Sequence, residues 1–331
     1  MNRRRSGRVF PASAASAKMF SALFFKLSLL LLVASIVLSS PVCYDQESSN
    51  KYRCMNFTSP DDFSEHVKPP ILHQDLTFIV KNSRLSHLPT RAFAGVNVSV
   101  LEFDNVHLEP FTLQDENPFA GLETTLRKVI FSEGSTVPEN WGLFANMLRL
   151  VTVRLSEITN LNLTSGFNQL PKSVRVITIA FSTIGHVDEN WVSELENLEA
   201  VGIRHCNLLT FSRSMLPKPA LHLWRLDLYK NNLTSLPRDF TAEMPALTSL
   251  TFENNQITTF DEECLAPLAK NQSNRVRFGG NPLHCDCNLR FVLSYPSSWL
   301  NAYCVTPLAL KHRPLKNVTE AQLCPPDAQS Q

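Results

Sequence analysis

Two adjacent segments of this 331-residue chain share one pattern of large apolar residues and asparagine. Residues 223–236 and 247–260 both follow the spacing LxxLxLxxNxLxxL, and their starts lie 24 residues apart. Six positions match in each copy, which two unrelated amphipathic segments would not explain. The LxL core indicates a short strand whose alternate side chains point to one side. The chain is therefore built from a recurring unit of a strand followed by a turn.

The asparagine of each copy, Asn231 or Asn255, lies where the chain leaves the predicted strand. Its amide can bond loop backbone groups that would otherwise be buried without partners. One unit cannot bury its apolar side alone, but stacked copies bury it jointly. The pattern resembles the leucine-rich repeat, which implies an α/β solenoid. We expect a horseshoe with a parallel β-sheet on the concave face and short helices or turns on the convex face.

Weaker copies extend the array upstream and once downstream. The predicted repeat starts are residues 75, 98, 126, 148, 174, 198, 223, 247 and 273, and the first four rest on fewer matches. The predicted strand cores are Phe78/Val80, Leu101/Phe103, Val129/Phe131, Val151/Val153, Ile177/Ile179, Val201/Ile203, Leu226/Leu228, Leu250/Phe252 and Val276/Phe278. The asparagine column reads Ser83, Val106, Gly134, Ser156, Ser182, Cys206, Asn231, Asn255 and Asn281. About eight or nine repeats therefore occupy residues 75–280.

Residues 1–40 differ in kind from the repeats. Basic residues precede Met19, and the apolar run that follows is interrupted by Lys26. The uninterrupted part, 27–38, is shorter than the roughly 20 residues that a membrane span needs. We interpret 1–40 as a secretory signal peptide cleaved between Ser39 and Pro41. A signal anchor is the alternative, and Met19 is an alternative start.

The remainder of the chain is mildly acidic. Residues 1–40 hold six basic and no acidic residues, which leaves 25 Lys and Arg against 30 Asp and Glu. This balance gives no reason to expect a nucleic acid partner.

Glycosylation sequons and cysteines agree with export. Six Asn-x-Ser/Thr sequons favour the secretory pathway. They are Asn56, Asn97, Asn162, Asn232, Asn271 and Asn317. Two of the eight cysteines lie within the repeats: Cys206 in the asparagine column and Cys264 at a convex core position. They fall in different layers, so we expect no bond between them.

The segment that follows the repeats resembles the cysteine-rich C-terminal flanking module of extracellular leucine-rich repeat proteins. The matching features are Asn281-Pro282, Cys285, Cys287, Trp299, Cys304 and Cys324. In that family the first cysteine pairs with the third and the second with the fourth, which implies Cys285–Cys304 and Cys287–Cys324. A zinc site is the alternative for such a cluster, and secretion argues against it.

The N-terminal flank departs from the family, which usually has four cysteines there. Only Cys43 and Cys54 are present, and we expect them to bond to each other. The expected divisions are a signal peptide (1–40), an N-terminal cap (41–74), repeats (75–280), a C-terminal cap (281–324) and a tail (325–331). The tail carries no membrane anchor signal, which favours a soluble, secreted protein if the sequence is complete.

No pattern of catalytic residues or metal ligands stands out. The chain lacks GxSxG, HExxH and phosphate-binding glycine motifs, and its nine histidines show no ligand spacing. We expect no enzyme activity, no metal and no cofactor. The irregular early repeats and short N-terminal flank also resemble the non-catalytic leucine-rich-repeat subunit of a secreted luciferase and its arthropod relatives.

The concave face offers a candidate surface for extracellular protein partners. Its middle is smooth and weakly apolar, with Leu150, Thr152, Val176, Thr178, Ala180, Ala200 and Gly202. The C-terminal side offers anchors of the kinds that interfaces favour. The candidate contact residues are Arg204, Arg225, Asp227, Tyr229, Glu253 and Arg277, with Arg275 beside them. Alternatively, the small side chains only accommodate sheet curvature.

Three functions fit these features. They are a secreted recognition module, a non-catalytic partner subunit of a secreted enzyme, and an extracellular-matrix scaffold component. Matrix proteins often carry basic patches that bind glycosaminoglycans. The residues that resemble such a patch here are Lys311, His312, Arg313 and Lys316.

Overall fold

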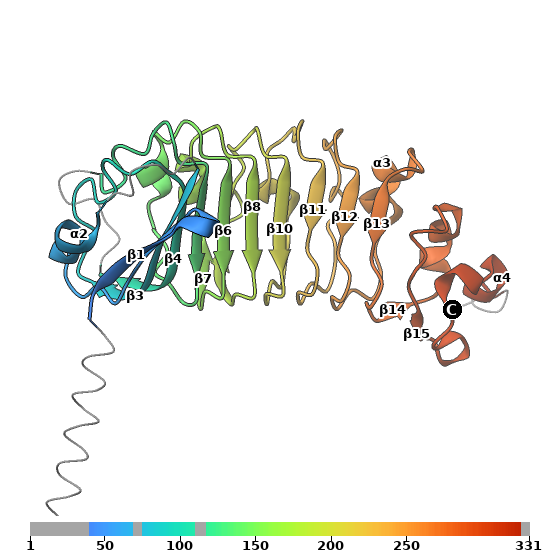
Figure 1. The fold of residues 1–331 in the computed structure, drawn as a ribbon. Helices are drawn as coiled ribbons and strands as arrows, with labels where there is room; N and C mark the ends of the chain where they lie inside the picture. The colour runs from blue at the N-terminus through green and yellow to red at the C-terminus, as the bar shows by residue number, and fades with distance from the viewer. Residues whose placement is uncertain (1–39, 69–74, 110–116, 326–331) are drawn as a thin grey trace, which may run out of the picture. The chain divides into compact units, whose positions relative to one another are not determined.

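In the computed structural model, which describes residues 40–68, 75–109 and 117–325, eleven strands form one sheet. The strand order in this sheet is β1-β2-β3-β4-β5-β6-β8-β10-β11-β12-β13. All of these strands lie in the compact unit Val42–Gln331. Only β1 and β2 pair antiparallel; the rest of the sheet is parallel. Figure 1 shows these strands side by side in chain order, as a solenoid requires.

The strands are short, and the connections between them hold single turns of helix. The sheet consists of β1 (Val42–Gln46), β2 (Lys51–Met55), β3 (Leu76–Leu85), β4 (Val98–Leu108), β5 (Lys128–Ser132), β6 (Thr152–Ser156), β8 (Val176–Ala180), β10 (Ala200–Arg204), β11 (Arg225–Asp227), β12 (Ser249–Thr251) and β13 (Arg275–Arg277). Two further pairs are β7 (Leu161–Leu163) with β9 (Ile184–Val187) and β14 (Leu283–His284) with β15 (Cys304–Thr306). The α-helices are α2 (Asp61–His66), α3 (Ala266–Ala269) and α4 (Glu320–Leu323). The 3-10 helices are η1 (Glu47–Ser49), η2 (Trp141–Phe144), η3 (Ser165–Gln169), η4 (Arg213–Met215), η5 (Glu262–Cys264), η6 (Cys287–Ser294), η7 (Leu308–Leu310) and η8 (Leu315–Asn317).

The register of the sheet confirms eight of the nine predicted strand cores and corrects the fourth. Val153 and Leu155 pair with Ile177 and Ile179, so the core of that repeat is Val153/Leu155 and not Val151/Val153. Residues 151, 153 and 155 are all apolar, so a period of two fits either pair and cannot fix the register. With the corrected frame Leu150 is a fully buried first core residue, not a residue of the exposed face.

The asparagines that follow the last strands bond neighbouring repeats together. Asn255 accepts the Leu233 N–H at 3.0 Å, and its amide donates to the carbonyls of Leu228 and Phe252 at 2.9 and 3.0 Å. Asn231 and Asn281 make the same set of bonds one repeat before and after. Because all three are buried, these bonds satisfy loop backbone that water does not reach.

In earlier repeats a serine hydroxyl replaces the asparagine amide. Ser83 and Ser182 each accept one N–H of the preceding repeat and donate to one carbonyl. The predicted column is wrong at two places: Ser135, not Gly134, bonds the Val106 N–H, and Ile158, not Ser156, lies in the ladder position of the fourth repeat. The second difference follows from the corrected register of β6.

Each repeat turns through a residue with left-handed backbone just before the ladder position; in the third repeat Gly134, also left-handed, lies between this residue and Ser135. We call these the corner residues; their φ values lie between 47° and 73°. They are Asn82, Asn105, Glu133, Glu157, Phe181, His205, Lys230, Asn254 and Gly280. From Glu157 to Asn254 each corner N–H donates to a carbonyl of the next repeat at 2.9–3.0 Å. The turn therefore changes the chain direction while the lateral bonding continues.

Buried aromatic rings fill the connections on the side of the core opposite the sheet. Trp141 and Trp191 are at most 1% exposed, and Phe167 lies between them with ring centroids 4.5 and 5.7 Å away. Phe119 and Phe144 stack at 4.5 Å in the earlier repeats. The two tryptophans are thus packing residues.

Disulfides close both ends of the described array. Cys43 and Cys54 face each other across the β1–β2 hairpin, and β2 continues into the parallel sheet beside β3. At the other end the bonds are Cys285–Cys304 and Cys287–Cys324. The C-terminal cap packs so closely that a Cβ on Gly279 would lie 2.4 Å from the Asn301 carbonyl oxygen. Glycine is therefore needed where the last strand meets the cap.

The predicted signal peptide and the tail after Pro325 lie outside the described residues, apart from Ser40. Within the residues that the structure does describe, no helix is long and apolar enough to cross a lipid bilayer.

Candidate functional site

The outward-pointing residues of β6 to β13 form a surface that we call the sheet face. They are Thr152, Arg154, Ser156, Val176, Thr178, Ala180, Ala200, Gly202, Arg204, Arg225, Asp227, Tyr229, Ser249, Thr251, Glu253, Arg275, Arg277 and Gly279. The part from Val176 to Gly202 is uncharged and small. A methyl group added at Gly202 would meet its nearest neighbour, Thr178 Cγ2, at 3.8 Å, so this part has free space in front of it.

Three of the predicted contact residues form one ion cluster. Asp227 Oδ2 lies 2.6 Å from Arg204 Nη2 and 3.1 Å from Arg225 Nη2, and its Oδ1 accepts the Tyr229 N–H at 3.2 Å. The Asp227 residue is only 6% exposed. Its carboxylate is therefore occupied within the chain, and it holds the two guanidiniums in place rather than offering a free charge to a partner.

Tyr229 belongs to a row of three aromatic rings that crosses three consecutive repeats. Its ring centroid lies 5.1 Å from that of His205, and His205 lies 4.5 Å from Phe181. We call Phe181, His205 and Tyr229 the aromatic row. It runs along the edge of the sheet face where the strands end, because two of its members are corner residues and Tyr229 immediately precedes one.

Phe181 is unusual at its position. It is 59% exposed, and its φ is 53°. The other corner residues are Asn, Glu, His, Lys or Gly, which adopt left-handed backbone more easily, are well solvated by water, or both. A phenylalanine there has two unfavourable features, a backbone that bulky residues avoid and a ring in solvent. Neither is offset by packing in the core.

A hollow of about 720 Å³ lies beside the aromatic row. Its walls include the three rings, the thiol-bearing Cys206, and the polar side chains of Lys230 and Gln256. Apolar rings next to hydrogen-bonding groups in a concave surface are typical of places where another molecule docks.

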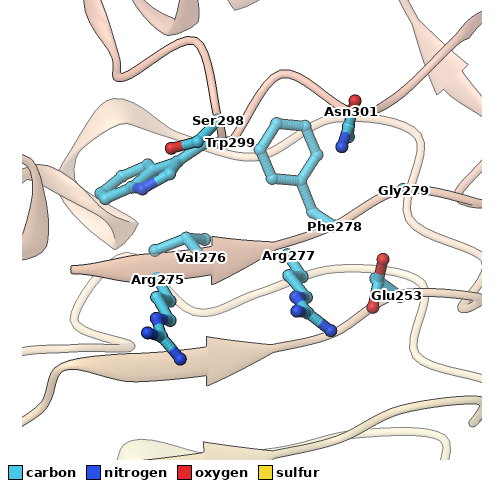
Figure 2. Close-up of a pocket in the computed structure, with 9 residues that line it drawn as sticks. All are labelled: Glu253, Arg275, Val276, Arg277, Phe278, Gly279, Ser298, Trp299 and Asn301. Carbon is cyan, nitrogen blue, oxygen red and sulfur yellow. The ribbon is translucent and has the colours of Figure 1, made fainter. Parts of the chain in front are cut away.

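Glu253 and Arg277 lie on the two repeats that follow Tyr229, nearer the C-terminal cap, and the Glu253 carbonyl accepts the Lys230 N–H at 2.9 Å right beside Tyr229. Together with Arg275 they line a second hollow of about 370 Å³ next to the C-terminal cap. Figure 2 shows the Arg275 and Arg277 side chains leaving β13 on the same side and pointing toward β12. The six predicted residues are thus divided among an ion cluster, an aromatic row and a basic end.

The two unbridged cysteines are not reactive groups. The Cys206 thiol donates to the Arg204 carbonyl at 3.2 Å, and the Cys264 thiol donates to the Pro237 carbonyl at 3.2 Å. Burial raises the pKa of the Cys206 thiol, and it raises the pKa of Cys264 to about 11. Both are therefore protonated near neutral pH, and the thiolate is the nucleophilic form.

A group of potential metal ligands lies at α2 in the N-terminal cap: Asp62, Glu65 and His66. Asp62 already accepts the N–H groups of Thr58 and Ser59 at 2.7 and 2.9 Å. Its carboxylate thus has a structural role at the start of the helix.

Most of the sequon asparagines are on the surface. Five are exposed, namely Asn97, Asn162, Asn232, Asn271 and Asn317, and Asn56 is half-buried. Asn232 also lines the hollow beside the aromatic row. A glycan there would lie at the margin of the candidate site.

The sequence pattern singled out Tyr229 but missed Phe181 and His205. Both lie one position after the outward-facing strand residues that the repeat frame selects. Strand periodicity carries no signal for them, and only the backbone conformation shows that Phe181 is the one phenylalanine among the nine described corner residues.

Comparisons with known proteins agree with this geometry. The family model for the leucine rich repeat matches residues 222–272. Toll-like receptor 9 of Mus musculus is 27% identical over 125 residues, which is 38% of this chain and 12% of the receptor. The chain therefore corresponds to a small part of that receptor.

Two solved structures have a similar fold. A chain of the Toll–Spatzle complex of Drosophila has a TM-score of 0.54 at 15% identity, over 75% of this chain and 42% of that one. Human 5T4, a trophoblast glycoprotein described as Wnt-activated inhibitory factor 1, has a TM-score of 0.50 at 18% identity, over 85% and 96%. With the matched repeats and the parallel sheet, these similarities show that the chain has the solenoid fold of leucine-rich repeats.

Proposed function

We propose that this chain is an extracellular, non-enzymatic recognition module that binds a protein partner through the aromatic row and the adjacent sheet face. The observation that carries the proposal is Phe181, a ring that is 59% exposed at a backbone position that disfavours it. Aromatic residues, phenylalanine among them, are enriched at protein interfaces. A partner that covers the row would remove its apolar surface from water.

The surroundings of the row support a protein ligand. His205 and Tyr229 combine apolar ring surface with polar atoms, which suits them to an interface that retains some water. The small residues around Gly202 leave space for a protruding partner beside them. The similar Drosophila structure is a complex of Toll with Spatzle, so this fold supports complexes between proteins.

The extracellular setting rests on other features of the chain. Three disulfides are typical of oxidising compartments, and six sequons are spread along the chain. Expression of the full chain in cultured animal cells tests secretion, and glycosidase treatment of the secreted product tests glycosylation. A product that stays inside the cell and does not change in mass would contradict this part of the proposal.

Site-specific photo-crosslinking tests the binding surface. A benzoylphenylalanine placed at Phe181 is compared with one at Leu148, an apolar residue that is also exposed, at 71%, and lies outside the sheet face. The secreted proteins are incubated with extracellular fluid from the source organism, and crosslinked products are identified by mass spectrometry. We expect one protein to be captured at Phe181 and not at Leu148.

The identity of the captured protein separates the alternatives. A secreted enzyme would indicate a partner subunit, and a matrix component would indicate a scaffold. Purified partner should then bind the Phe181→Asn variant at least about tenfold more weakly, as for loss of an interface anchor. Equal capture at both positions, or unchanged affinity of the variant, would remove the aromatic row as the site.

A further inference from the structure

Arg275 and Arg277 project from the last strand of the sheet without a charged partner. Both residues are exposed, and within the described ranges neither takes part in an ion pair. Alternate residues of a strand lie roughly 6.5–7 Å apart on the same face. Figure 2 shows the two side chains parallel to each other and directed toward β12. We call these residues the arginine pair.

The neighbouring strand, β12, places hydroxyl groups between charged residues of β11 and β13. Ser249 pairs laterally with Arg225 on one side and with Arg275 on the other, and Thr251 lies between Asp227 and Arg277. Adjacent strands lie about 4.8 Å apart, so Ser249 is flanked by two guanidinium-bearing residues. Arginines beside hydroxyl donors present several hydrogen-bond donors to one side of the sheet.

The carboxylates on this part of the face do not neutralise the arginine pair. Asp227 is buried and already bonds Arg204 and Arg225. Glu253 is the other carboxylate nearby, and it has no ion pair with either arginine. The guanidiniums of Arg275 and Arg277 therefore keep their positive charge without a neutralising partner and repel each other. The composition of the chain beyond residue 40 is by contrast mildly acidic. The positive charge is a local feature of this end of the sheet face.

The C-terminal cap limits what can bind there. Its residues Ser298 and Asn301 form the far wall of the 370 Å³ hollow, and the Trp299 indole N–H donates to the Asn274 carbonyl at 2.8 Å. The hollow is small and closed on the cap side, so it has room for side chains rather than for a long polymer. These features favour carboxylates of a protein over sulfates of a polysaccharide.

We propose that the arginine pair receives acidic side chains of the protein that occupies the sheet face. Two carboxylates on alternate residues of an extended segment have the spacing of the two guanidiniums, and each arginine can bond a carboxylate with two parallel hydrogen bonds. This inference rests on the proposed function, and it adds the charge and spacing of the partner segment that lies nearest the cap.

The test uses the full secreted chain and a defined probe. A fluorescent peptide of alternating glutamate and glycine is titrated by anisotropy, and its glutamine counterpart and heparin are titrated alongside. The test variant is Arg275→Gln with Arg277→Gln. The matched control is Arg154→Gln, an exposed arginine of the same sheet face in β6.

We expect the glutamate peptide to bind the unaltered chain and the Arg154→Gln control equally. The double variant should bind it about tenfold more weakly, with an unchanged thermal melt because both side chains are exposed. The glutamine peptide should not bind, and binding should weaken in high salt. Asn301→Asp, which places a negative charge on the wall of the hollow, should also weaken binding.

Equal binding of the glutamate peptide by the unaltered chain and the double variant would overturn the inference. If the double variant lost heparin binding while peptide binding was unchanged, the site would be one for sulfated polysaccharide. Neither result bears on the aromatic row, because the crosslinking at Phe181 is measured separately. If capture at Phe181 succeeds and the peptide result is negative, the proposed function stands and the acidic chemistry of the partner is wrong.

Discussion

The phenyl ring of Phe181 and the imidazole of His205 lie 4.5 Å apart on corner residues of consecutive repeats. Replacing Phe181 by asparagine, the residue found at three other corners, should not reduce stability. Asparagine adopts left-handed backbone more readily, so the free energy of unfolding should be unchanged or higher by up to about 1 kcal/mol. Binding of the partner should fall in the same variant.

Denaturant melts of Phe181→Asn measure the first part of this prediction. Leu148→Asn is the control, because it removes an exposed apolar residue from outside the sheet face. A clear loss of stability in Phe181→Asn would mean that the ring has a structural role, and the argument for a binding anchor would fail.

Tyr229 and Leu228 are adjacent but point to opposite sides of the sheet. Leu228 is fully buried, whereas Tyr229 is half-exposed in the aromatic row. Leu228→Ala should therefore cost roughly 2–5 kcal/mol of stability through lost contacts and a cavity. Tyr229→Ala should leave the melt nearly unchanged and weaken partner binding by about 1–2 kcal/mol or more. Equal losses of melting temperature in the two variants would contradict this assignment.

Asn255 should be one of the most sensitive polar residues of the array. It is 1% exposed and bonds groups of two repeats through its oxygen and its amide. Asn255→Ala leaves these buried groups without partners, which should cost about 2–4 kcal/mol. Gln256→Ala, at the exposed neighbouring position, should stay within about 0.5 kcal/mol of the unaltered chain. Urea unfolding of the two variants side by side measures the difference.

Cys264 should make the protein less stable at alkaline pH. Its thiol is fully buried, and burial raises its pKa from 9.0 to about 11. Between these values the unfolded chain loses the thiol proton first, so stability is complete below about pH 9 and falls as pH approaches 11. The contribution lost is on the order of 2–3 kcal/mol.

Cys264→Ala is the corresponding test. Its unfolding free energy should decline less steeply between pH 9 and 11 than that of the unaltered chain. Part of the decline should persist, because burial also raises the pKa of Tyr295. Identical pH profiles for the two proteins would show that the thiol does not titrate as expected.

The repeat frame could be predicted wherever apolar and polar residues alternate strictly. The pattern from Leu223 to Phe260 leaves one register, since a shift by one residue would turn every leucine toward solvent. At β6 the apolar residues Val151, Val153 and Leu155 satisfy two registers equally. The choice there depends on lateral pairing with β8, which a single sequence does not contain.

The candidate site was predicted less completely than the fold. Tyr229 could be found because its outward direction follows from strand alternation. Phe181 and His205 could not, because their direction depends on left-handed corners that strand periodicity does not describe. Asp227 was assigned to partner binding from its position, and only the structure places two guanidiniums against its carboxylate.

The left-handed corner has a consequence for how such a protein can change over time. From Glu157 to Asn254 the lateral hydrogen bond at each corner is made by the backbone N–H, and the side chain lies outside the core. From Glu157 to Asn254 the five corner side chains can therefore change with little effect on the core, within the limits of left-handed backbone, and together they form a line along one edge of the sheet. New specificity can arise along this line one repeat at a time, while the leucines that hold the solenoid together stay the same.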